Sequence, residues 1–231
     1  MKIGIIGAMD VEVRSLKEAM KIERTLTRAG MEFCEGTIGR IPAVVVKCGI
    51  GKVNAGMCVQ ILADLFSVTH VLNTGIAGSL NNDINIGDIV VSVDALYHDM
   101  DVTFMGYKAG QVPGMDFVSF PADEQLRLSA VRACREAAPD IQVFEGRIAS
   151  GDQFIAERTR KNWIRTTFSA DCTEMEGCAI AHAAYLNSLP FVIIRAISDK
   201  ADESVTVSYE EFESKAAEHC AHLVRYMIEH L

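Results

Sequence analysis

The sequence contains little proline and fewer basic than acidic residues, and each shortage excludes a class of protein. Of its 231 residues, 5 are Pro and 17 are Gly, so neither a collagen-like repeat nor a long disordered segment is expected. Lys and Arg total 22 against 31 Asp and Glu, which gives a formal charge of −9. Because binding to phosphate backbones depends on Lys and Arg, a nucleic-acid polymer is disfavoured as partner. A small nucleic-acid building block in a pocket is not excluded.

The sequence also lacks the cysteine pairs of a disulfide or zinc protein and the apolar runs of a membrane protein. Its seven cysteines are irregularly spaced and form no Cys-x-x-Cys pair. We therefore expect free, buried thiols in a reducing compartment, and no zinc site. No apolar run reaches the roughly 18 residues of a membrane helix, and Asp10 and Glu12 interrupt the first one too early for a signal peptide. These features predict a soluble, cytoplasmic protein.

Strand and helix patterns alternate along the chain. Apolar, β-branched segments predict strands over residues 2–7, 31–37, 41–48, 68–73, 87–93, 142–148 and 191–196. A period of 3.6 residues predicts helices over residues 9–20, 53–66, 123–138, 176–187 and 209–230. The nearly continuous apolar strands indicate burial on both faces. Because no Pro/Ser-rich linker divides the chain, the sequence predicts one α/β domain over residues 1–231, with a central mixed β-sheet flanked by helices on both faces.

In such sheets ligands bind beyond the carboxyl ends of the strands, so the residues that follow each strand are the functional candidates. The first strand ends at Gly7, and Asp10 and Glu12 follow it. A dinucleotide-binding loop would have Gly-x-Gly-x-x-Gly here and would bring phosphate to the helix N-terminus, where two acids would repel it. A nicotinamide cofactor is therefore disfavoured. Glu12 by itself also fits a first-turn carboxylate that stabilises the helix dipole.

Small and aromatic residues follow two other strands. The stretch at 73–79 is rich in Gly and small residues, which allow either the close approach of a ligand or a tight turn. Phe154 lies beside the Gly151 turn. It is either a stacking platform for a flat base or a core residue, and its context alone favours the core.

Acidic residues accompany the last two strand ends. Glu174 and Glu176 flank Met175 before a predicted helix, where they could accept from the vicinal hydroxyls of a sugar or stabilise the helix N-terminus. Arg195 lies inside an apolar strand and needs a carboxylate partner. Asp199 follows that strand, and desolvation in a pocket would raise its pKa and suit it to general-acid catalysis. An N-cap is the alternative.

Taken in order, these motifs resemble the bacterial 5′-methylthioadenosine/S-adenosylhomocysteine nucleosidases, which share the purine nucleoside phosphorylase-like fold. The shared motifs are KIGIIGAM at 2–9, CGIGKV at 48–53, NTG at 73–75, GDIVVS at 87–92, YHD at 97–99, DVT at 101–103, SGD at 150–152, FI at 154–155, EME at 174–176 and RAISD at 195–199. The resemblance implies hydrolysis of the N-glycosidic bond of 5′-methylthioadenosine and S-adenosylhomocysteine, and of 5′-deoxyadenosine. The products would be adenine and a 5-thioribose, as in methionine salvage.

The resemblance also implies roles for matched residues. Glu12 would orient and activate the attacking water, and Asp199, held by Ser198, would protonate N7 of adenine. Glu176 would bind the ribose hydroxyls, and Arg195 would pair with the carboxylates of the water site. Phe154 would stack on adenine, the backbone of Ile155 would read its edge, and Met175 would pack on the ribose. The other expected substrate contacts are Met9, Ile50, Ile76, Ala77, Gly78, Glu174 and Tyr209.

The family is dimeric, and this implies a second set of contacts. Val102, Met105, Tyr107 and Pro113 would reach the 5′-thio group in the partner subunit. The implied reaction passes through an oxocarbenium-like state, in which charge grows on both the base and the sugar. An acid on the base side and a water-positioning carboxylate on the sugar side answer these charges. The resemblance therefore implies no metal and no other cofactor.

Two further activities compete with this assignment. A phosphorylase would need cations near C1′, but the turn after the first strand has acids and no Arg, and Arg14 is expected to face solvent. A nucleoside-binding protein would have lost one of the three acids, which are all present. Ile76 stands where many family members have Ser, which removes a hydroxyl from the pocket. The aminodeoxyfutalosine nucleosidases share most of these motifs, so the preferred substrate stays open.

Overall fold

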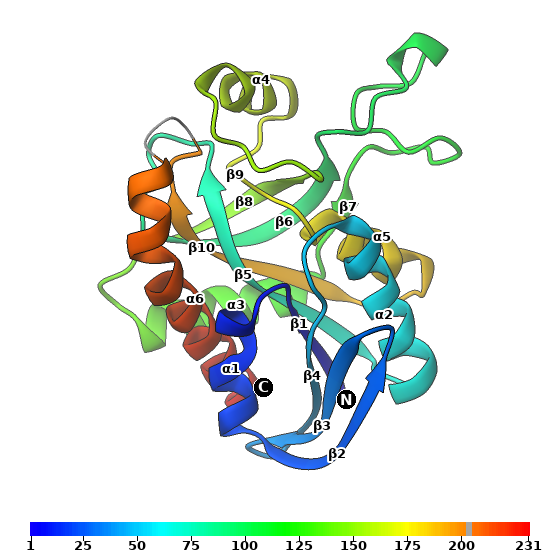
Figure 1. Cartoon of the computed structure of the whole chain (residues 1–231), viewed down its shortest axis with the longest axis vertical. Coiled ribbons are helices and arrows are strands. Elements are labelled where there is room, and N and C mark those ends of the chain that lie inside the picture. The colour runs from blue at the N-terminus through cyan, green and yellow to red at the C-terminus, as the bar shows by residue number, and fades with distance from the viewer. Residues whose placement is uncertain (202–204) are drawn as a thin grey trace.

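A mixed β-sheet forms the centre of the molecule, and helices cover both of its faces (Figure 1). The computed structural model describes residues 1–201 and 205–231, without the side chains of residues 205–211. Within those residues ten strands form one sheet, in the spatial order β10-β6-β8-β9-β5-β1-β4-β3-β2 with β7 beside β6. In chain order they are β1 (Ile3–Gly7), β2 (Lys21–Arg28), β3 (Met31–Ile38), β4 (Ile41–Lys47), β5 (His70–Ser79), β6 (Ile89–Tyr97), β7 (Phe120–Pro121), β8 (Val143–Ser150), β9 (Cys172–Glu174) and β10 (Phe191–Asp199).

Part of the sheet closes on itself. β10 pairs with both β6 and β5, so that β10, β6, β8, β9 and β5 form a ring. β1 and β4 extend the sheet in parallel from β5, and β3 and β2 continue it as antiparallel strands. β1, β5 and β10 are parallel neighbours, so their carboxyl ends meet at one edge. That edge is the expected ligand-binding side of such a sheet.

Two helical layers cover the sheet, and alternate side chains of a strand pack against different layers. Helices α1 (Asp10–Ala19), α3 (Glu124–Ala137) and α6 (Val205–Glu229) lie on one face, and α2 (Lys52–Phe66) and α5 (Gly177–Leu186) lie on the other (Figure 1). Ile3 and Ile5 of β1 pack with the first layer, and Ile6 packs with the second. Because side chains alternate along a strand, β1 is buried on both faces, as its continuous apolar sequence predicts.

The predicted fold class is confirmed, but two elements were missed for the same physical reason. β2 is exposed along almost its whole length at the sheet edge, so it has no alternating apolar pattern. Helix α4 (Arg158–Phe168) buries few apolar side chains, among them Ile164 and Phe168. A short 3-10 helix, η1 (Thr103–Met105), and the brief strands β7 and β9 were also missed. Elements that are largely exposed, as β2 is, or only two or three residues long, as β7, β9 and η1 are, leave little periodicity in the sequence.

Four strands run two or more residues further than predicted, namely β5, β6, β8 and β10, and two of these extensions shape the site. β5 continues to Ser79 and pairs with β10 through Gly75 and Gly78, so the tight turn considered for residues 73–79 is wrong. β10 continues to Asp199, which brings that carboxylate to the end of a buried strand. Small residues in β5 allow bulky charged side chains to lie against the sheet, as described below.

The structure also bears on the cysteine and membrane expectations. All seven cysteines are free and buried, as expected. No helix among the described residues has the length and apolar composition needed to cross a membrane. In the same part of the chain, no group of three or more His, Cys, Asp or Glu side chains is arranged to hold a metal ion.

Candidate active site

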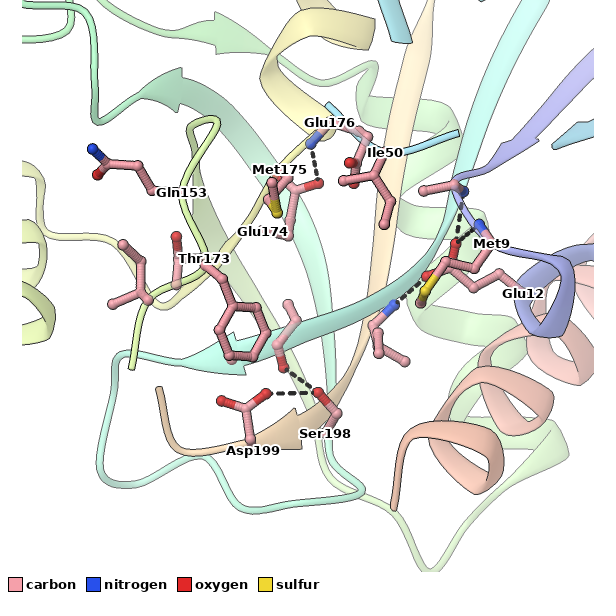
Figure 2. Close-up of a pocket in the computed structure, with 16 residues that line it drawn as sticks. Met9, Glu12, Ile50, Gln153, Thr173, Glu174, Met175, Glu176, Ser198 and Asp199 are labelled. Atoms are coloured by element: carbon pink, nitrogen blue, oxygen red, sulfur yellow. Dashed lines mark hydrogen bonds between the residues drawn. The ribbon is translucent and has the colours of Figure 1, made fainter. Parts of the chain in front are cut away.

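A pocket lies at the edge where β1, β5 and β10 end (Figure 2). The empty space within it is about 630 Å³, part of which is open to solvent. The expected residues that line it are Met9, Glu12, Ile50, Ile76, Ala77, Gly78, Phe154, Ile155, Glu174, Met175, Glu176, Ser198 and Asp199. The fold therefore brings together residues from the ends of six strands, β1, β4, β5, β8, β9 and β10.

Three further residues line the pocket that the sequence did not single out. Ala8, Gln153 and Thr173 each lie next to an expected residue, and that adjacency was the only available signal. Thr173 is buried, and its Oγ1 atom has no hydrogen-bond partner among the described residues. Thr173 pairs with Gly78 of β5, so its placement depends on a short strand that the sequence pattern does not reveal.

Glu12 is held rigidly at one side of the pocket. It lies in the first turn of α1 and is only 4% exposed. Its Oε2 atom accepts hydrogen bonds from the backbone N–H groups of Ala8 (2.7 Å) and Met9 (3.0 Å), and Oε1 accepts from Ile76 N–H (3.1 Å). Glu12 is therefore both a carboxylate in the first turn of α1, which was the alternative considered for it, and a residue that lines the pocket.

The surroundings of Glu12 favour a carboxyl group that can hold or release a proton. Burial raises its pKa, and the charge of Arg195 and the backbone donors oppose that rise without cancelling it. A Cβ atom at Gly75 would collide with Glu12 Oε1, so only glycine at this position of β5 lets the carboxylate approach the strand. A group with a raised pKa is suited to general-base catalysis near neutral pH.

Arg195 lies behind the pocket wall and does not line the cavity. It is 2% exposed, and it donates to Glu174 Oε2 at 2.7 Å and to Asn73 Oδ1. Arg195 was expected to pair with the carboxylates of the water site, whereas the ion pair found among the described residues is with Glu174. Glu12 experiences its charge without a direct ion pair. The guanidinium compensates negative charge that would otherwise be buried alone.

Glu174 has both carboxylate oxygens occupied by the protein. Besides Arg195, it accepts from the backbone N–H groups of Glu176 (3.0 Å) and Gly177 (2.7 Å) and from the Ser150 hydroxyl. Burial raises its pKa, but the Arg195 charge and these hydrogen bonds outweigh burial and lower it. Glu174 is thus an ionised group that fixes the start of α5. It also lines the pocket, and the substrate contact expected for it stays a prediction.

Glu176 lies at the N-cap of α5, on the same wall of the pocket. Its Oε1 atom accepts from the backbone N–H of Gly51 at 2.7 Å. Burial and then the negative charge of Glu174 raise its pKa to about 8. Hydrogen bonds donated by a ligand would favour its charged form, so this carboxyl group is suited to a partner that offers hydroxyl donors.

Asp199 occupies another side of the pocket, at the end of β10, and is 3% exposed. Ser198 Oγ donates to its Oδ2 atom at 2.8 Å, and Ala201 N–H donates to Oδ1 at 2.7 Å. A Cβ atom at Gly78 would lie only 2.8 Å from Oδ1. Figure 2 shows the Glu12 and Asp199 side chains on different sides of the pocket, with Glu174 and Glu176 on a third.

Phe154 also lines the pocket, and its side chain is 58% exposed. The interpretation of Phe154 as a core residue is therefore wrong.

The remaining expected contacts lie elsewhere. Val102, Met105, Tyr107 and Pro113 belong to the segment between β6 and β7, which projects away from the sheet (Figure 1). They do not line the pocket of their own chain. Tyr209 falls among the residues whose side chains are outside the described part of the structure. The expectations for these residues therefore stay predictions.

Comparison with known proteins gives a consistent result. The family model of the phosphorylase superfamily matches residues 2–229. A 5′-methylthioadenosine/S-adenosylhomocysteine nucleosidase of Anoxybacillus flavithermus is 43% identical over 100% of this chain and 99% of its own length. The solved Neisseria meningitidis nucleosidase of the same name, in complex with methylthio-immucillin-A, is 36% identical with a TM-score of 0.96, covering 100% and 99%. Futalosine hydrolase of Helicobacter pylori is 31% identical with a TM-score of 0.94, covering 100% and 98%.

Proposed function

The chain belongs to the phosphorylase superfamily and, within it, to the 5′-methylthioadenosine/S-adenosylhomocysteine nucleosidases, and from this premise we propose that it is an N-glycosyl hydrolase that releases adenine from these two nucleosides. The observation that carries the proposal is the placement of two buried carboxyl groups, Glu12 and Asp199, on different sides of one pocket. Hydrolysis of a glycosidic bond needs an acid on the leaving group and a carboxylate near the water.

Asp199 serves the base side of the reaction. As the C1′–N9 bond breaks, its electrons move into adenine, and protonated Asp199 transfers its proton to N7. The Ser198 hydroxyl, 2.8 Å from Oδ2, holds the carboxyl group toward the base. Phe154 stacks on adenine, and the backbone of Ile155 reads its edge. A positioned acid of this kind contributes on the order of 10² to 10⁴-fold to the rate.

Glu12 serves the water side. Backbone donors on Ala8, Met9 and Ile76 fix both of its oxygens, so the carboxylate needs no rearrangement as the reaction proceeds. The water oxygen bonds to C1′ on the face opposite the base, and its proton passes to Glu12. The products are adenine and a 5-thioribose.

Glu176 binds the ribose hydroxyls, and Met175 packs against the sugar. Ionised Glu176 accepts hydrogen bonds from neighbouring hydroxyl groups, while Gly51 N–H holds one of its oxygens. Arg195 supports this arrangement from behind the wall, because its ion pair with Glu174 fixes the start of α5. 5′-Deoxyadenosine fits the same scheme, since the 5′ substituent takes no part in the bond change.

Charge favours water over phosphate as the nucleophile. The described residues that line the pocket include three Glu and one Asp but no Lys or Arg. Arg14, the basic residue nearest in sequence to Glu12, is exposed and lies 3.6 Å from Glu218 of α6. A phosphorylase needs cations or several N–H donors for phosphate, and the N–H donors near Glu12 are already used by its carboxylate.

We also propose a cytoplasmic homodimer that acts in methionine salvage. α2 and α5 lie side by side (Figure 1), and each exposes large apolar side chains, as does the projecting segment. These side chains are Val53, Met57, Phe104, Met105, Tyr185 and Leu186. Exposed apolar patches of this kind are typical of subunit interfaces. In the dimer, Val102, Met105, Tyr107 and Pro113 reach the 5′-thio group in the partner's pocket, so Met105→Asp should yield monomers in light scattering and raise KM.

Incubation with 5′-methylthioadenosine in phosphate-free buffer tests the proposal. Free adenine and the 5-thioribose should appear, and added phosphate should neither speed the reaction nor yield a sugar phosphate. Strict phosphate dependence would instead identify a phosphorylase. Binding measured by calorimetry without any product would identify a nucleoside-binding protein, and either result would overturn the proposal.

A second substrate class is supported by one relative. The Helicobacter pylori protein with a TM-score of 0.94 is named futalosine hydrolase, and aminodeoxyfutalosine presents adenine and ribose in the same way as methylthioadenosine. Ile76 lines the pocket and offers no hydroxyl to the nucleoside. Comparison of kcat/KM for the two nucleosides, in the native chain and in Ile76→Ser, would rank the substrates and give the effect of this residue.

A further inference from the structure

Three charged residues that take no part in the reaction above meet beside the pocket. The motifs CGIGKV, YHD and SGD each contribute one charged residue, namely Lys52, Asp99 and Asp152. Lys52 Nζ lies 2.6 Å from Asp99 Oδ2 and 3.6 Å from Asp152 Oδ2. The three segments are far apart in sequence, so the fold itself creates this cluster, which we refer to as the charged clamp.

Backbone hydrogen bonds tie the same segments together. Asp99 Oδ2 also accepts from the backbone N–H of Asp152 at 2.9 Å, and Asp152 Oδ1 accepts from the backbone N–H of Lys52 at 2.9 Å. Each pair of segments is therefore joined directly. The Lys52 side chain passes close to the Tyr97 ring, at 5.4 Å from its centroid. Hydrogen bonds to charged groups in partly buried sites are stronger than neutral ones.

Close packing fixes one of these junctions further. A Cβ atom at Gly151 would lie 2.6 Å from His98 Nε2 and 2.9 Å from Asp99 Cγ, so the chain before Asp152 approaches the YHD motif as closely as glycine allows. His98 is 2% exposed. Because Gly151 and the YHD motif are in such close contact, a movement of one relative to the other would disrupt their packing.

Two of the segments joined by the clamp contribute to different parts of the pocket wall. Immediately before Lys52, Ile50 lines the pocket and Gly51 N–H holds Glu176. Immediately after Asp152, the chain supplies Gln153, Phe154 and Ile155 to the pocket. The first segment thus serves the proposed ribose site, and the second serves the proposed adenine site.

We propose that Lys52, Asp99 and Asp152 are positioning residues that set the distance between the ribose-binding and adenine-binding walls of the pocket. They do not line the cavity and act through Gly51 and Phe154. The inference rests on the proposed function, because it assigns a sugar and a base to those walls. Loss of the clamp loosens both walls at once, which weakens nucleoside binding more than it slows the bond change at Glu12 and Asp199.

Asp99 is ionised in this cluster at neutral pH. Burial raises its pKa, but the hydrogen bonds from Lys52 and Asp152 N–H outweigh burial and lower it. Neutralising either partner therefore leaves a partly buried charge uncompensated. Lys52→Met keeps the length of the side chain and removes its charge, whereas Lys52→Arg keeps the charge. Lys17→Met is the matched control, since Lys17 forms a comparable ion pair with Glu32 at 3.0 Å outside the pocket.

The test compares steady-state kinetics and product binding in these variants. In Lys52→Met and Asp99→Asn, KM for 5′-methylthioadenosine should rise about tenfold while kcat changes less than about threefold. Adenine affinity measured by calorimetry should fall in parallel, since the adenine wall is displaced in the absence of turnover too. Lys52→Arg should recover most of the loss, and Lys17→Met should match the native enzyme in all three values.

Two outcomes would overturn the inference. One is an unchanged KM and adenine affinity in folded Lys52→Met, and the other is a fall in kcat and melting temperature without rescue by arginine. Should Asp99→Asn not fold, Asp152→Asn replaces it, because that side chain is half exposed. The proposed function is tested separately by the native chain: absence of adenine release there rejects the activity, whereas unchanged variants of an active enzyme reject only the clamp.

Discussion

The molecule carries charge in two very different regions, the pocket edge and the outer strands. At the pocket edge, Glu12, Glu174 and Arg195 are each almost fully buried. Around β2 and β3, pairs such as Lys17 with Glu32 and Arg24 with Glu35 leave at least one partner largely exposed. The separations are similar, 2.7 Å for Arg195 with Glu174 and for Arg24 with Glu35. Geometry alone therefore does not distinguish the regions, and access to water does.

Burial changes what the same residue types can do. An exposed pair exchanges its interaction for hydration at little net gain, so it neither shifts stability much nor holds a proton at an unusual pH. At the pocket edge Arg195 is the one guanidinium beside Glu12, Glu174 and Glu176 among the described residues, which leaves an excess of carboxyl groups. Burial raises the pKa values of Glu12 and Glu176, and the charge of Glu174 adds to the rise at Glu176. Such groups can accept and release protons near neutral pH.

The largest effect is expected for Asp199→Asn. An amide cannot deliver a proton to the leaving base, so kcat should fall by about 10² to 10⁴-fold. The fold should persist, because the amide oxygen can still accept from Ala201 N–H and the NH₂ group can donate to Ser198 Oγ. Rates by chromatography, with calorimetry of adenine binding, check this. A variant that keeps near-native turnover would remove Asp199 from the mechanism.

Arg195→Met should produce the largest loss of stability. The change leaves Glu174 ionised and buried without its partner, and breaking a buried pair in this way costs about 3–5 kcal/mol. Urea denaturation would measure the free energy of unfolding. Arg225→Met is the matched surface change, since Arg225 pairs with Glu229 at 2.9 Å on the solvent-facing side of α6. Equal losses in the two variants would mean that burial does not separate the regions.

Stability should also depend on pH through the pocket. The pKa of Glu176 is raised from 4.5 to about 8, so between these values the folded chain holds a proton that the unfolded chain has lost. The free energy of unfolding should therefore fall as pH rises from about 4.5 to about 8, by on the order of a few kcal/mol. Glu12 contributes in the same direction. Glu176→Gln should flatten this slope in urea denaturation at several pH values, and an unchanged slope would contradict the assignment.

The sequence was most informative at strand ends. Glu12, Glu174, Glu176 and Asp199 were identified because acids rarely follow buried strands without a partner or a function, and all four line the pocket. The sequence did not indicate which carboxylate would form the ion pair with Arg195. Arg195 contacts Glu174, which lies on the short strand β9, and β10 pairs with β5 in a register that opposes Arg195 and Gly75. Register between distant strands has no local signature in one sequence.

Elements and contacts that bury little surface were also beyond prediction. β2 and α4 were missed because their residues are mostly polar or exposed. The segment after Gly151 was expected to matter for Phe154, yet the contact of Asp152 with Lys52 joins residues 100 positions apart. Motif order identified the family, whereas the spatial meeting of three motifs required the fold.

The smallest effect is expected for Lys17→Met, which marks the other end of the comparison. Glu32, the partner of Lys17, has a side chain that is 58% exposed, so water replaces most of what the ion pair provides. The free energy of unfolding should change by less than about 1 kcal/mol. The loss of unfolding free energy in Lys17→Met should shrink further in 0.5–1 M salt, roughly the range that screens surface charges. The loss in Arg195→Met should persist, because ions do not enter the buried site. A salt-insensitive loss of several kcal/mol at Lys17 would show that the outer strands depend on their charges as the pocket does.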